Sequence, residues 1–258
     1  TQQAQNNSNS TYIDQAKPQR EGEELNQAAL DQWLKQQFPD LQGTVEIQQF
    51  SGGASNWTYR LYYPASGHDW ILRRPPAGTK AKSAHDMGRE YRIQAALKPH
   101  FPYVPEMVTW CQDESIIGAE FYIMERLIGI IPRSRMPRGL QLTRAQVQSL
   151  CRSMVDRLVD LHQVDFSAAG LDQLDRGTGY ARRQIEGWNQ RFQRARTWNV
   201  RGADYVMDWL QERIPEDSGH CLVHNDWRFD NLVLSPDQPT QIIGVLDWEL
   251  ATIGDPLM

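Results

Sequence analysis

The stretch that decides the fold lies near the end of the chain and reads CLVHNDWRFDNLVLS, residues 221–235. The apolar residues at both ends of this stretch are typical of buried strands. Between them stand a histidine, an arginine, asparagines and two aspartates. Burying a polar group without a partner costs roughly 1–3 kcal/mol on protein mutational scales. We therefore expect these polar groups to have a chemical use.

The spacing of the polar residues indicates what that use is. His224 and Asp226 are separated by one residue, Asn231 follows five residues after Asp226, and Asp247 occurs in the later segment GVLDWE. Carboxylate and amide oxygens are the hard ligands that Mg²⁺ prefers. Phosphoryl transfer needs metal ions at the nucleotide phosphates, an aspartate at the acceptor hydroxyl and a cation near the migrating group. Arg228 is a candidate for that cation, so the pattern favours a phosphotransferase.

The composition is that of an ordinary globular protein. The 258 residues are 40% hydrophobic and 23% charged, which is enough for one large core or two modest ones. The formal net charge of −5 argues against general nucleic-acid binding, because such domains usually carry a basic surplus. No run approaches the ~20 apolar residues of a membrane helix, and no apolar signal-peptide core opens the chain. Three widely spaced cysteines suggest neither a disulfide framework nor a thiolate metal site. We expect a cytoplasmic protein that binds neither nucleic acid nor membrane.

The first half of the chain is expected to be rich in strands. Residues 1–20 are polar and are interpreted as a disordered tail. A helical period follows over 23–38, and a second helix is expected from a capping box formed by Ser83 and Asp86. The runs that predict strands are 44–50, 57–64, 70–76, 107–111 and 120–127.

The second half is expected to be mainly helical. Helical periods cover 142–162, with Thr143 as the cap, then 179–197 and 203–214, and two short strands follow at 231–235 and 241–248. A connection rich in proline, arginine and glycine separates the two patterns. The sequence therefore predicts an α+β fold with two lobes. The N-lobe, an antiparallel sheet with a helix over 21–127, would bind nucleotide, and the helical C-lobe over 128–258 would hold the catalytic and acceptor groups.

The octet HNDWRFDN resembles the H-x-D-x-x-x-x-N loop of the aminoglycoside phosphotransferase and choline kinase families, which are relatives of the protein kinases. LDWE resembles their metal-binding strand, and the resemblance extends from about Val45 to Pro256. The blocks GGASNWTYRL, ILRRPP, GREYRI and YIMERL are most similar to kinase-like domains fused to some acyl-CoA dehydrogenases and to their stand-alone bacterial counterparts. This resemblance implies a protein-kinase-like fold, ATP and Mg²⁺ as cofactors, 4-hydroxyacyl-CoA thioesters as acceptors and association with an acyl-CoA dehydrogenase domain. Such relatives continue with further helices, so the C-lobe is expected to be incomplete at Met258.

The resemblance also implies a role for each candidate residue. Asp226 would act as the catalytic base or orient the acceptor, His224 would shape the loop, and Arg228 would contact phosphate. Asn231 and Asp247 would bind Mg²⁺. The residues expected to contact or orient the nucleotide are Gly52, Gly53, Ser55, Asn56, Arg73, Glu90, Glu125 and Leu127.

Three parts of that nucleotide site have distinct expected functions. The segment 51–56 would lie over the phosphates, where small residues let backbone N–H groups approach oxygen. The segment 125–127 would be a hinge that meets adenine through its backbone. Arg73 or Arg74 stands where many relatives have lysine, and we favour Arg73, with Glu90 as its partner, because it follows Ile-Leu as the lysine would. Arginine keeps the charge but differs in geometry from an ammonium group. Glu249 and Asp255 are further candidates.

The acceptor can be approached from charge alone. Seven arginines between residues 176 and 202 face one acid, Glu186, in a chain whose net charge is −5. Such a surplus suits an anionic acceptor, for which coenzyme A with its phosphates is an example. Two alternatives remain open: an aminoglycoside or amino-alcohol kinase, and a pseudokinase that binds nucleotide without turnover. The arginines disfavour the former, and the complete set of Asp226, Asn231 and Asp247 disfavours the latter.

Overall fold

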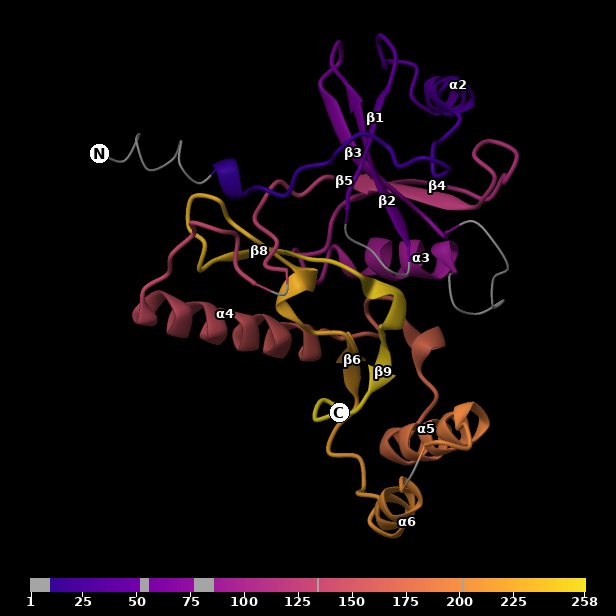
Figure 1. Cartoon of the computed structure of the whole chain (residues 1–258), viewed down its shortest axis with the longest axis vertical. Coiled ribbons are helices and arrows are strands. Elements are labelled where there is room, and N and C mark those ends of the chain that lie inside the picture. The colour runs from indigo at the N-terminus through magenta and orange to yellow at the C-terminus, as the bar shows by residue number, and fades with distance from the viewer. Residues whose placement is uncertain (1–9, 52–55, 77–85, 134, 201) are drawn as a thin grey trace. The chain divides into compact units, whose positions relative to one another are not determined.

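The computed structural model describes residues 10–51, 56–76, 86–133, 135–200 and 202–258. The chain divides into two compact units. The first comprises Thr1–Arg157 and Asp226–Glu249, and the second comprises Leu158–Asn225 and Leu250–Met258. Strands and helices occur in both units, as Figure 1 shows.

The first unit is built on a five-stranded sheet in the order β1-β2-β3-β5-β4. All neighbouring strands in this sheet are antiparallel. The five strands expected from the sequence are therefore confirmed, with bounds within two residues of those expected. The elements are β1 (Glu46–Gln49), β2 (Trp57–Tyr63), β3 (His68–Arg74), β4 (Met107–Cys111), β5 (Phe121–Glu125), α2 (Gln27–Gln37) and α3 (Met87–Leu97).

Side chains of the sheet alternate between two faces, as the two-residue repeat of a strand requires. Leu72 of β3 lies in one apolar core with Leu30 of α2. Ile71 of β3 lies in a second core with Met87 of α3. The two helices therefore cover opposite faces of the sheet. By the same alternation Arg73 shares the α3 face with Ile71, whereas Arg74 shares the α2 face with Leu72.

The start of α4 agrees with the prediction from the sequence, and the start of α3 differs from it. Helix α4 (Arg144–His162) begins after Thr143, whose hydroxyl accepts from Gln146 N at 3.3 Å, while Gln146 Oε1 accepts from Thr143 N at 2.8 Å. This reciprocal capping box confirms Thr143 as the cap. The capping box expected at Ser83 is wrong, because Asp86 itself is the N-cap of α3 and accepts from Arg89 N at 2.7 Å. Ser83 lies outside the described residues.

A short hairpin completes the first unit. Strands β7 (Leu232–Leu234) and β8 (Ile242–Val245) pair antiparallel, which confirms the two expected strands. An isolated bridge joins Leu234 to Ile130, just after the five-stranded sheet. Because of these contacts the compact units do not coincide with the lobes expected at 21–127 and 128–258.

Residues 10–20 make defined contacts, although the sequence predicts a disordered tail over 1–20. After a short 3₁₀ turn, Ser10–Tyr12, the chain pairs along the edge strand β1. Lys17 N donates to Gln49 O at 2.8 Å, and Gln49 N donates to Lys17 O at 2.7 Å. Backbone pairing with an edge strand needs no apolar side chains, which is why the composition does not reveal it. Residues 1–9 lie outside the described part of the chain.

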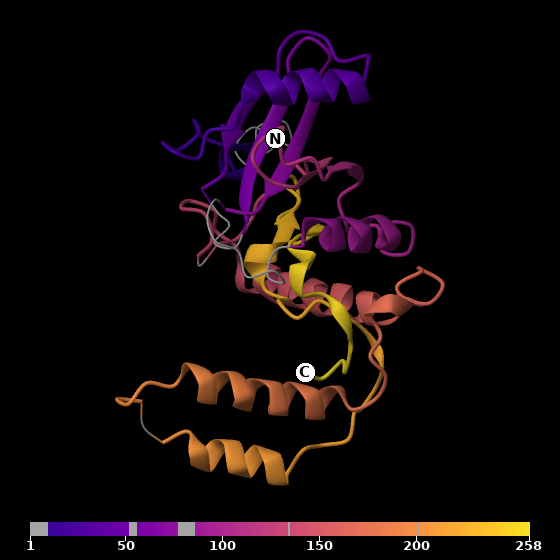
Figure 2. The ribbon, with the colours of Figure 1, turned by 90° about the vertical axis from the view of Figure 1, so that its right-hand side faces the viewer.

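The second unit combines helices with one small sheet. Helices α5 (Tyr180–Ala195) and α6 (Asp204–Glu212) lie side by side, as Figure 2 shows. Strand β6 (Cys221–Val223) pairs antiparallel with β9 (Thr252–Gly254), a strand that the sequence did not predict. The 3₁₀ turn Asp172–Leu174 precedes α5. Within the described residues of either unit, no helix combines the length and apolar character needed to span a bilayer.

Candidate active site

The β7–β8 hairpin brings Asn231 and Asp247 together. Leu232 at the start of β7 pairs with Val245 at the end of β8, so the residues just outside the ladder are also neighbours. Leu246 N donates to Asn231 O at 2.8 Å, which continues the pairing by one step. Asp247 then adopts a left-handed conformation with φ of 70°, a region in which aspartate and asparagine are enriched among residues other than glycine. The strand therefore ends in a turn at the carboxylate.

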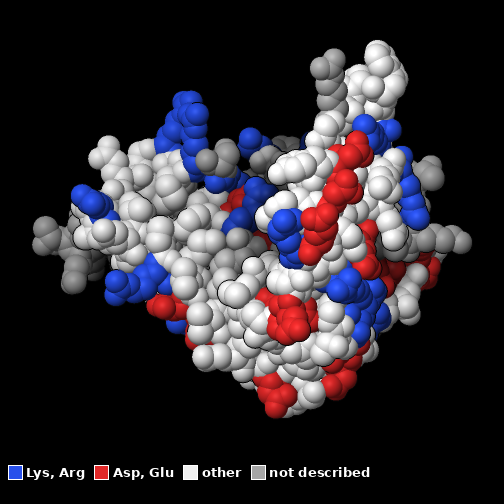
Figure 3. Space-filling model, turned by 90° about the horizontal axis from the view of Figure 1, so that it is seen from below, with Lys and Arg blue, Asp and Glu red and all other residues white. Residues whose placement is uncertain are grey.

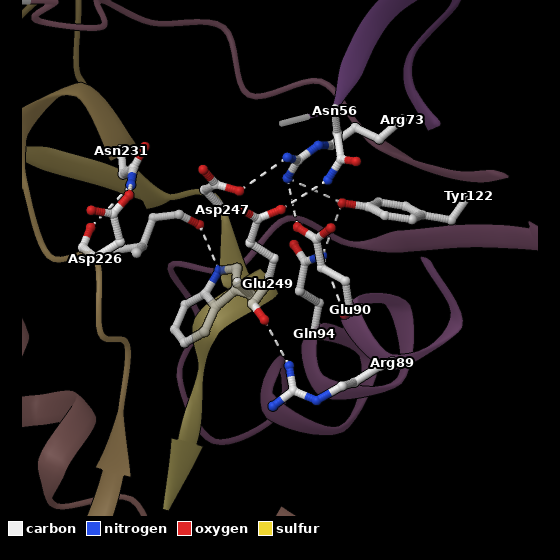
Figure 4. Close-up of polar contacts among 12 residues, drawn as sticks. Asn56, Arg73, Arg89, Glu90, Gln94, Tyr122, Asp226, Asn231, Asp247 and Glu249 are labelled. Atoms are coloured by element: carbon white, nitrogen blue, oxygen red, sulfur yellow. Dashed lines mark hydrogen bonds and ion pairs between the residues drawn. The ribbon is translucent and has the colours of Figure 1, made fainter. Parts of the chain in front are cut away.

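Asn231 also holds Asp226. Its side-chain amide nitrogen donates to Asp226 Oδ2 at 2.8 Å and to Asp226 O at 3.0 Å. Both partners are acceptors, so the NH₂ group must face them and the amide oxygen must face away. One asparagine thus fixes the aspartate loop while its amide oxygen faces away from Asp226, and the close-up in Figure 4 shows this pair.

Arg73 joins β3 to both α3 and the β7–β8 hairpin. Its Nη1 lies 2.5 Å from Glu90 Oε1, and its Nη2 lies 3.0 Å from Asp247 Oδ1. The neighbouring Arg74 instead donates to the backbone oxygens of Pro75 and Ile117. The strand alternation explains this difference, because only Arg73 is on the α3 face. Figure 4 shows Arg73 between the two carboxylates.

Burial makes this cluster electrostatically demanding. Side-chain exposure is 9% for Arg73 and 1% for Glu90. Burial alone would lower the pKa of Arg73, but Glu90, Tyr122 and Asp247 outweigh it and hold that pKa well above its usual range. Burial also raises the pKa of Glu90, which the charge of Arg73 opposes and the nearby Asp247 reinforces. Two carboxylates around one permanently charged guanidinium leave a local surplus of negative charge, which a divalent cation would balance.

Tyr122 and Gln94 support the pair and were not anticipated from the sequence. Tyr122 stands opposite Arg73 in the sheet register, and its hydroxyl lies 3.4 Å from Arg73 Nη1. Gln94 of α3 donates its side-chain amide to the same hydroxyl at 3.3 Å. Burial raises the pKa of Tyr122 well above its ordinary value. The sequence could have indicated Tyr122, because alternation along β5 places this residue on the α3 face.

Asn56, the last residue of the expected phosphate loop, is fully buried beside the hairpin. Its side-chain amide donates to Glu249 Oε2 at 3.0 Å. The backbone oxygen of Glu249 accepts from Arg89 Nη1 at 2.8 Å. Glu249 thus connects the start of β2 and helix α3 to the turn that follows Asp247. Gly52, Gly53 and Ser55 lie outside the described residues.

Arg228 has an acidic partner that the sequence left unassigned. Its guanidinium forms a bidentate pair with Asp230, and its Nη1 lies 4.0 Å from Asp226 Oδ1. The side chain of Arg228 is 59% exposed, so the pair fixes its direction without burying it. A charge held near Asp226 and open to solvent remains compatible with contact to a phosphate.

A pocket of about 370 Å³ in the first unit collects most of these groups. Its walls include Arg73, Asp226, Arg228, Asn231 and Asp247 from the cluster described above. The expected hinge residues Glu125 and Leu127 line the same pocket. Glu90 supports Arg73 from behind and is not part of the wall.

The hinge and the N-terminal segment form another part of this wall. Glu125 N donates to Glu106 O at 2.8 Å, whereas no described residue hydrogen-bonds to the backbone N–H or C=O of Leu127. Asp14 also lines the pocket, and its carboxylate accepts from Arg133 Nη2 at 2.8 Å. The sequence did not single out Asp14, because it lies in the expected tail.

Two candidates from the sequence belong to the second compact unit. His224 directly follows β6 and is buried. Asp255 accepts from Ser218 Oγ at 2.8 Å and from Leu257 N at 2.7 Å. These contacts give Asp255 a structural role in a turn, so the geometry offers no reason to keep it as a site residue.

The oxygen donors fit a metal bound together with a nucleotide. Within the described residues, no three His, Cys, Asp or Glu side chains gather where they could hold a metal ion. Mg²⁺ is usually held by one or two carboxylates plus substrate phosphates and water, so such a cage is not required. Asp247, the amide oxygen of Asn231 and the surplus negative charge meet that simpler requirement.

The chain has relatives among known proteins. Residues 46–258 match the model of the phosphotransferase enzyme family, APH. The chain belongs to this family. It is also 35% identical over 245 residues to acyl-CoA dehydrogenase family member 10 of Mus musculus, covering 95% of this chain and 22% of that protein. The resemblance to the kinase-like domains of acyl-CoA dehydrogenases is thereby confirmed.

Solved structures of phosphotransferases confirm the kinase-like fold. A candidate aminoglycoside phosphotransferase from Ralstonia eutropha matches with a TM-score of 0.75 and 33% identity, covering 91% of this chain and 68% of that chain. The macrolide 2′-phosphotransferase MphH of Brachybacterium faecium matches with a TM-score of 0.62 and 21% identity, covering 88% of this chain and 73% of that chain. This member of the phosphotransferase enzyme family therefore has a kinase-like α+β fold. It spans about a fifth of the length of the mouse relative.

Proposed function

We propose that the protein transfers the γ-phosphate of ATP, with Mg²⁺, to a hydroxyl group of an anionic acceptor, and that this acceptor is a 4-hydroxyacyl-CoA. The observation that carries the proposal is the cluster in which Asn231 holds Asp226 while Asp247 and Glu90 hold Arg73. Phosphoryl transfer relies on positioning and on charge stabilisation, and this cluster supplies groups for both.

In this proposal the nucleotide occupies the pocket of the first unit. Leu127 meets adenine through its backbone N–H and C=O groups, which no described residue engages. Arg73 directs its guanidinium to the phosphates, and Glu90 and Tyr122 keep that group in place. Asn56, anchored by Glu249, ends the loop that would cover the phosphates. Asn231 and Asp247 would hold Mg²⁺, which neutralises charge on phosphate oxygens when bound.

Asp226 then acts on the acceptor. Its carboxylate accepts a hydrogen bond from the acceptor hydroxyl, and the oxygen of that hydroxyl attacks the γ-phosphorus. A new O–P bond forms, the bond from the γ-phosphorus to the bridging oxygen breaks, and ADP leaves. The hydroxyl proton passes to Asp226, which releases it to water. Asn231 keeps the carboxylate oriented, and Arg228, aligned by Asp230, balances charge near the transferred group.

Asp14 gives the nucleotide proposal a specific test. We expect Asp14 to accept a hydrogen bond from a ribose hydroxyl, because its carboxylate lines the pocket next to the hinge. A hydrogen bond to a charged group contributes about 1.5–3 kcal/mol. Asp14→Ala should therefore raise the KM for ATP at least about tenfold and reduce the preference for ATP over 2′-deoxy-ATP. Steady-state kinetics with both nucleotides measures this.

The matched control is Asp40→Ala, because Asp40 is an exposed carboxylate of the same unit, with 75% side-chain exposure, and is not part of the pocket wall. This control should leave both KM values unchanged. An unchanged KM in Asp14→Ala, or an equal change in the two variants, would contradict a ribose contact.

The proposed acceptor rests on the positive charge of residues 176–202 and on the relatives of the chain. The arginine surplus in residues 176–202 suits an anion better than an aminoglycoside or choline, which are cations. The mouse relative carries the name of an acyl-CoA dehydrogenase, and association with such a domain is part of the proposal, as is a cytoplasmic location. Turnover on 4-hydroxyacyl-CoA, kanamycin and choline should be compared under the same conditions. Faster turnover on kanamycin or choline would overturn the proposed acceptor.

A second candidate function is a nucleotide-binding pseudokinase. The observation that favours it is the arginine at position 73, which already has carboxylate partners on both sides. Mg²⁺-dependent ATP consumption in the presence of a panel of hydroxyacyl-CoA thioesters separates the two functions. Nucleotide binding without any turnover on the panel would favour the pseudokinase.

A further inference from the structure

The second compact unit contains a small basic pocket of its own. The pocket has a volume of about 130 Å³, and Arg176, Arg183 and Arg191 line it together with Thr252. These are three of the seven arginines counted between residues 176 and 202. Part of the local surplus of positive charge therefore lines a cavity.

Two arginines of the segment outside the pocket have carboxylate partners. Arg182 lies 3.6 Å from Glu186, and Arg196 lies 2.8 Å from Asp204. Within the described residues, no salt bridge to a carboxylate is formed by the three pocket arginines. Basic and acidic side chains are interspersed on the face shown in Figure 3. The three pocket arginines therefore bring positive charge to the cavity that no salt bridge within the described residues offsets.

Two of the pocket arginines are held in place by other groups. Arg183 donates to the backbone oxygens of Gly177, at 2.8 Å, and Thr178. The guanidinium of Arg191 lies over the ring of Trp188, 4.8 Å from its centroid. A guanidinium has five N–H donors, so these contacts leave donors for a ligand. Side chains that are already ordered lose less entropy when they bind.

Nearby acids do not fill the pocket. Asp217 accepts from the backbone N–H groups of Tyr180 and Ala181, both at 2.9 Å, and so occupies the N-terminus of α5. Asp175 pairs with His220 at 2.9 Å, and the hydrogen bond from His220 lowers the pKa of Asp175. A ligand in the pocket would therefore have to use the guanidinium groups and not the helix N-terminus.

We infer that this pocket binds a terminal phosphomonoester of the acceptor, an inference that rests on the proposed function. Three guanidinium groups around a small cavity suit a compact dianion, because arginine pairs with phosphate through two parallel hydrogen bonds.

Coenzyme A and 3′-dephospho-CoA are the probes that test this inference. Binding is measured by calorimetry without nucleotide, on the intact chain and on a variant carrying Arg176→Gln and Arg191→Gln. The variant is expected to bind coenzyme A at least about tenfold more weakly, since hydrogen bonds to a charged group are lost, and to bind 3′-dephospho-CoA almost unchanged. The matched control carries Arg182→Gln and Arg194→Gln, which remove the same charge from exposed positions of the same unit and should change neither affinity more than twofold.

The outcomes separate this site from the proposed reaction. Equal losses in the two double variants would overturn the inference, because they would indicate a diffuse field and not a pocket. Equal binding of the two probes by the unmodified chain would also overturn it. Turnover on 4-hydroxyacyl-CoA is measured separately. Its absence, combined with selective loss of coenzyme A binding in the pocket variant, would reject the proposed reaction and support the phosphate site.

Discussion

Asp226→Asn is expected to lower the turnover number for phosphoryl transfer by about 10²–10⁴-fold, the range that a positioned general base contributes. Asparagine has the same size, and its oxygen can still accept from the amide of Asn231, which now donates to Asp226 at 2.8 Å. The loop should therefore keep its shape while losing the group that takes the hydroxyl proton. Steady-state kinetics on the acceptor that the unmodified enzyme uses provides the measurement.

Nucleotide binding and stability distinguish this loss from a folding defect. The Kd for ATP should change less than about threefold, because Asp226 acts on the acceptor and a threefold change is under 1 kcal/mol. Asp237→Asn is the matched control, since Asp237 is an exposed aspartate in the turn of the same hairpin. A variant at Asp226 that loses ATP binding and thermal stability as much as it loses turnover would contradict the catalytic assignment.

The β7–β8 hairpin was predictable because the residues that form it are close together in the sequence. Asn231 and Asp247 flank two short apolar runs joined by a turn, and antiparallel pairing of such runs necessarily brings their flanking residues together. The choice of Arg73 over Arg74 came from the resemblance, because Arg73 follows Ile-Leu as the lysine of relatives would. Alternation along β3, which places Arg73 on the α3 face, agrees with that choice. The hairpin expectation uses periodicity over a few residues, where sequence patterns are most direct.

The missed features depend on contacts between distant segments. Asp14 is held at the pocket by its backbone N–H, which donates to Gly129 O at 3.2 Å. Such backbone contacts have no side-chain signature. Strand β9 is three residues long and is recognisable only through its partner β6. Arg228 and Asp230 are close in the sequence, but solvent and Asp226 are competing partners for the guanidinium. The spacing of these residues alone therefore does not predict which carboxylate Arg228 contacts.

Arg73→Met is expected to destabilise the protein by about 3–5 kcal/mol, the usual cost of removing one partner from a buried ion pair. The reason is Glu90, which is 1% exposed and would keep a buried carboxylate without its guanidinium. The loss should be smallest at acidic pH. The pKa of Glu90 is already raised in the folded protein, so the folded state binds this proton more tightly than the unfolded state. The cost of keeping Glu90 charged therefore grows as the pH rises above about 4.3, the ordinary pKa of glutamate. Urea unfolding at several pH values measures it.

Arg74→Met is the matched control, because Arg74 is the adjacent arginine, is equally buried and, within the described part of the chain, donates its side-chain hydrogen bonds to backbone oxygens. Leaving such oxygens without a donor costs about 1–3 kcal/mol. The stability of Arg74→Met should not show the pH dependence expected for Arg73→Met, and the KM for ATP should not change as it does in the Arg73 variant.

A double variant separates the structural role of Arg73 from its chemical role. Arg73→Met combined with Glu90→Leu should recover much of the stability, since replacing a whole buried pair by apolar groups is often neutral. It should not recover phosphoryl transfer, because Asp247 and the nucleotide phosphates would still lack their cation. Recovery of turnover together with stability in the double variant would show that Arg73 serves the fold alone.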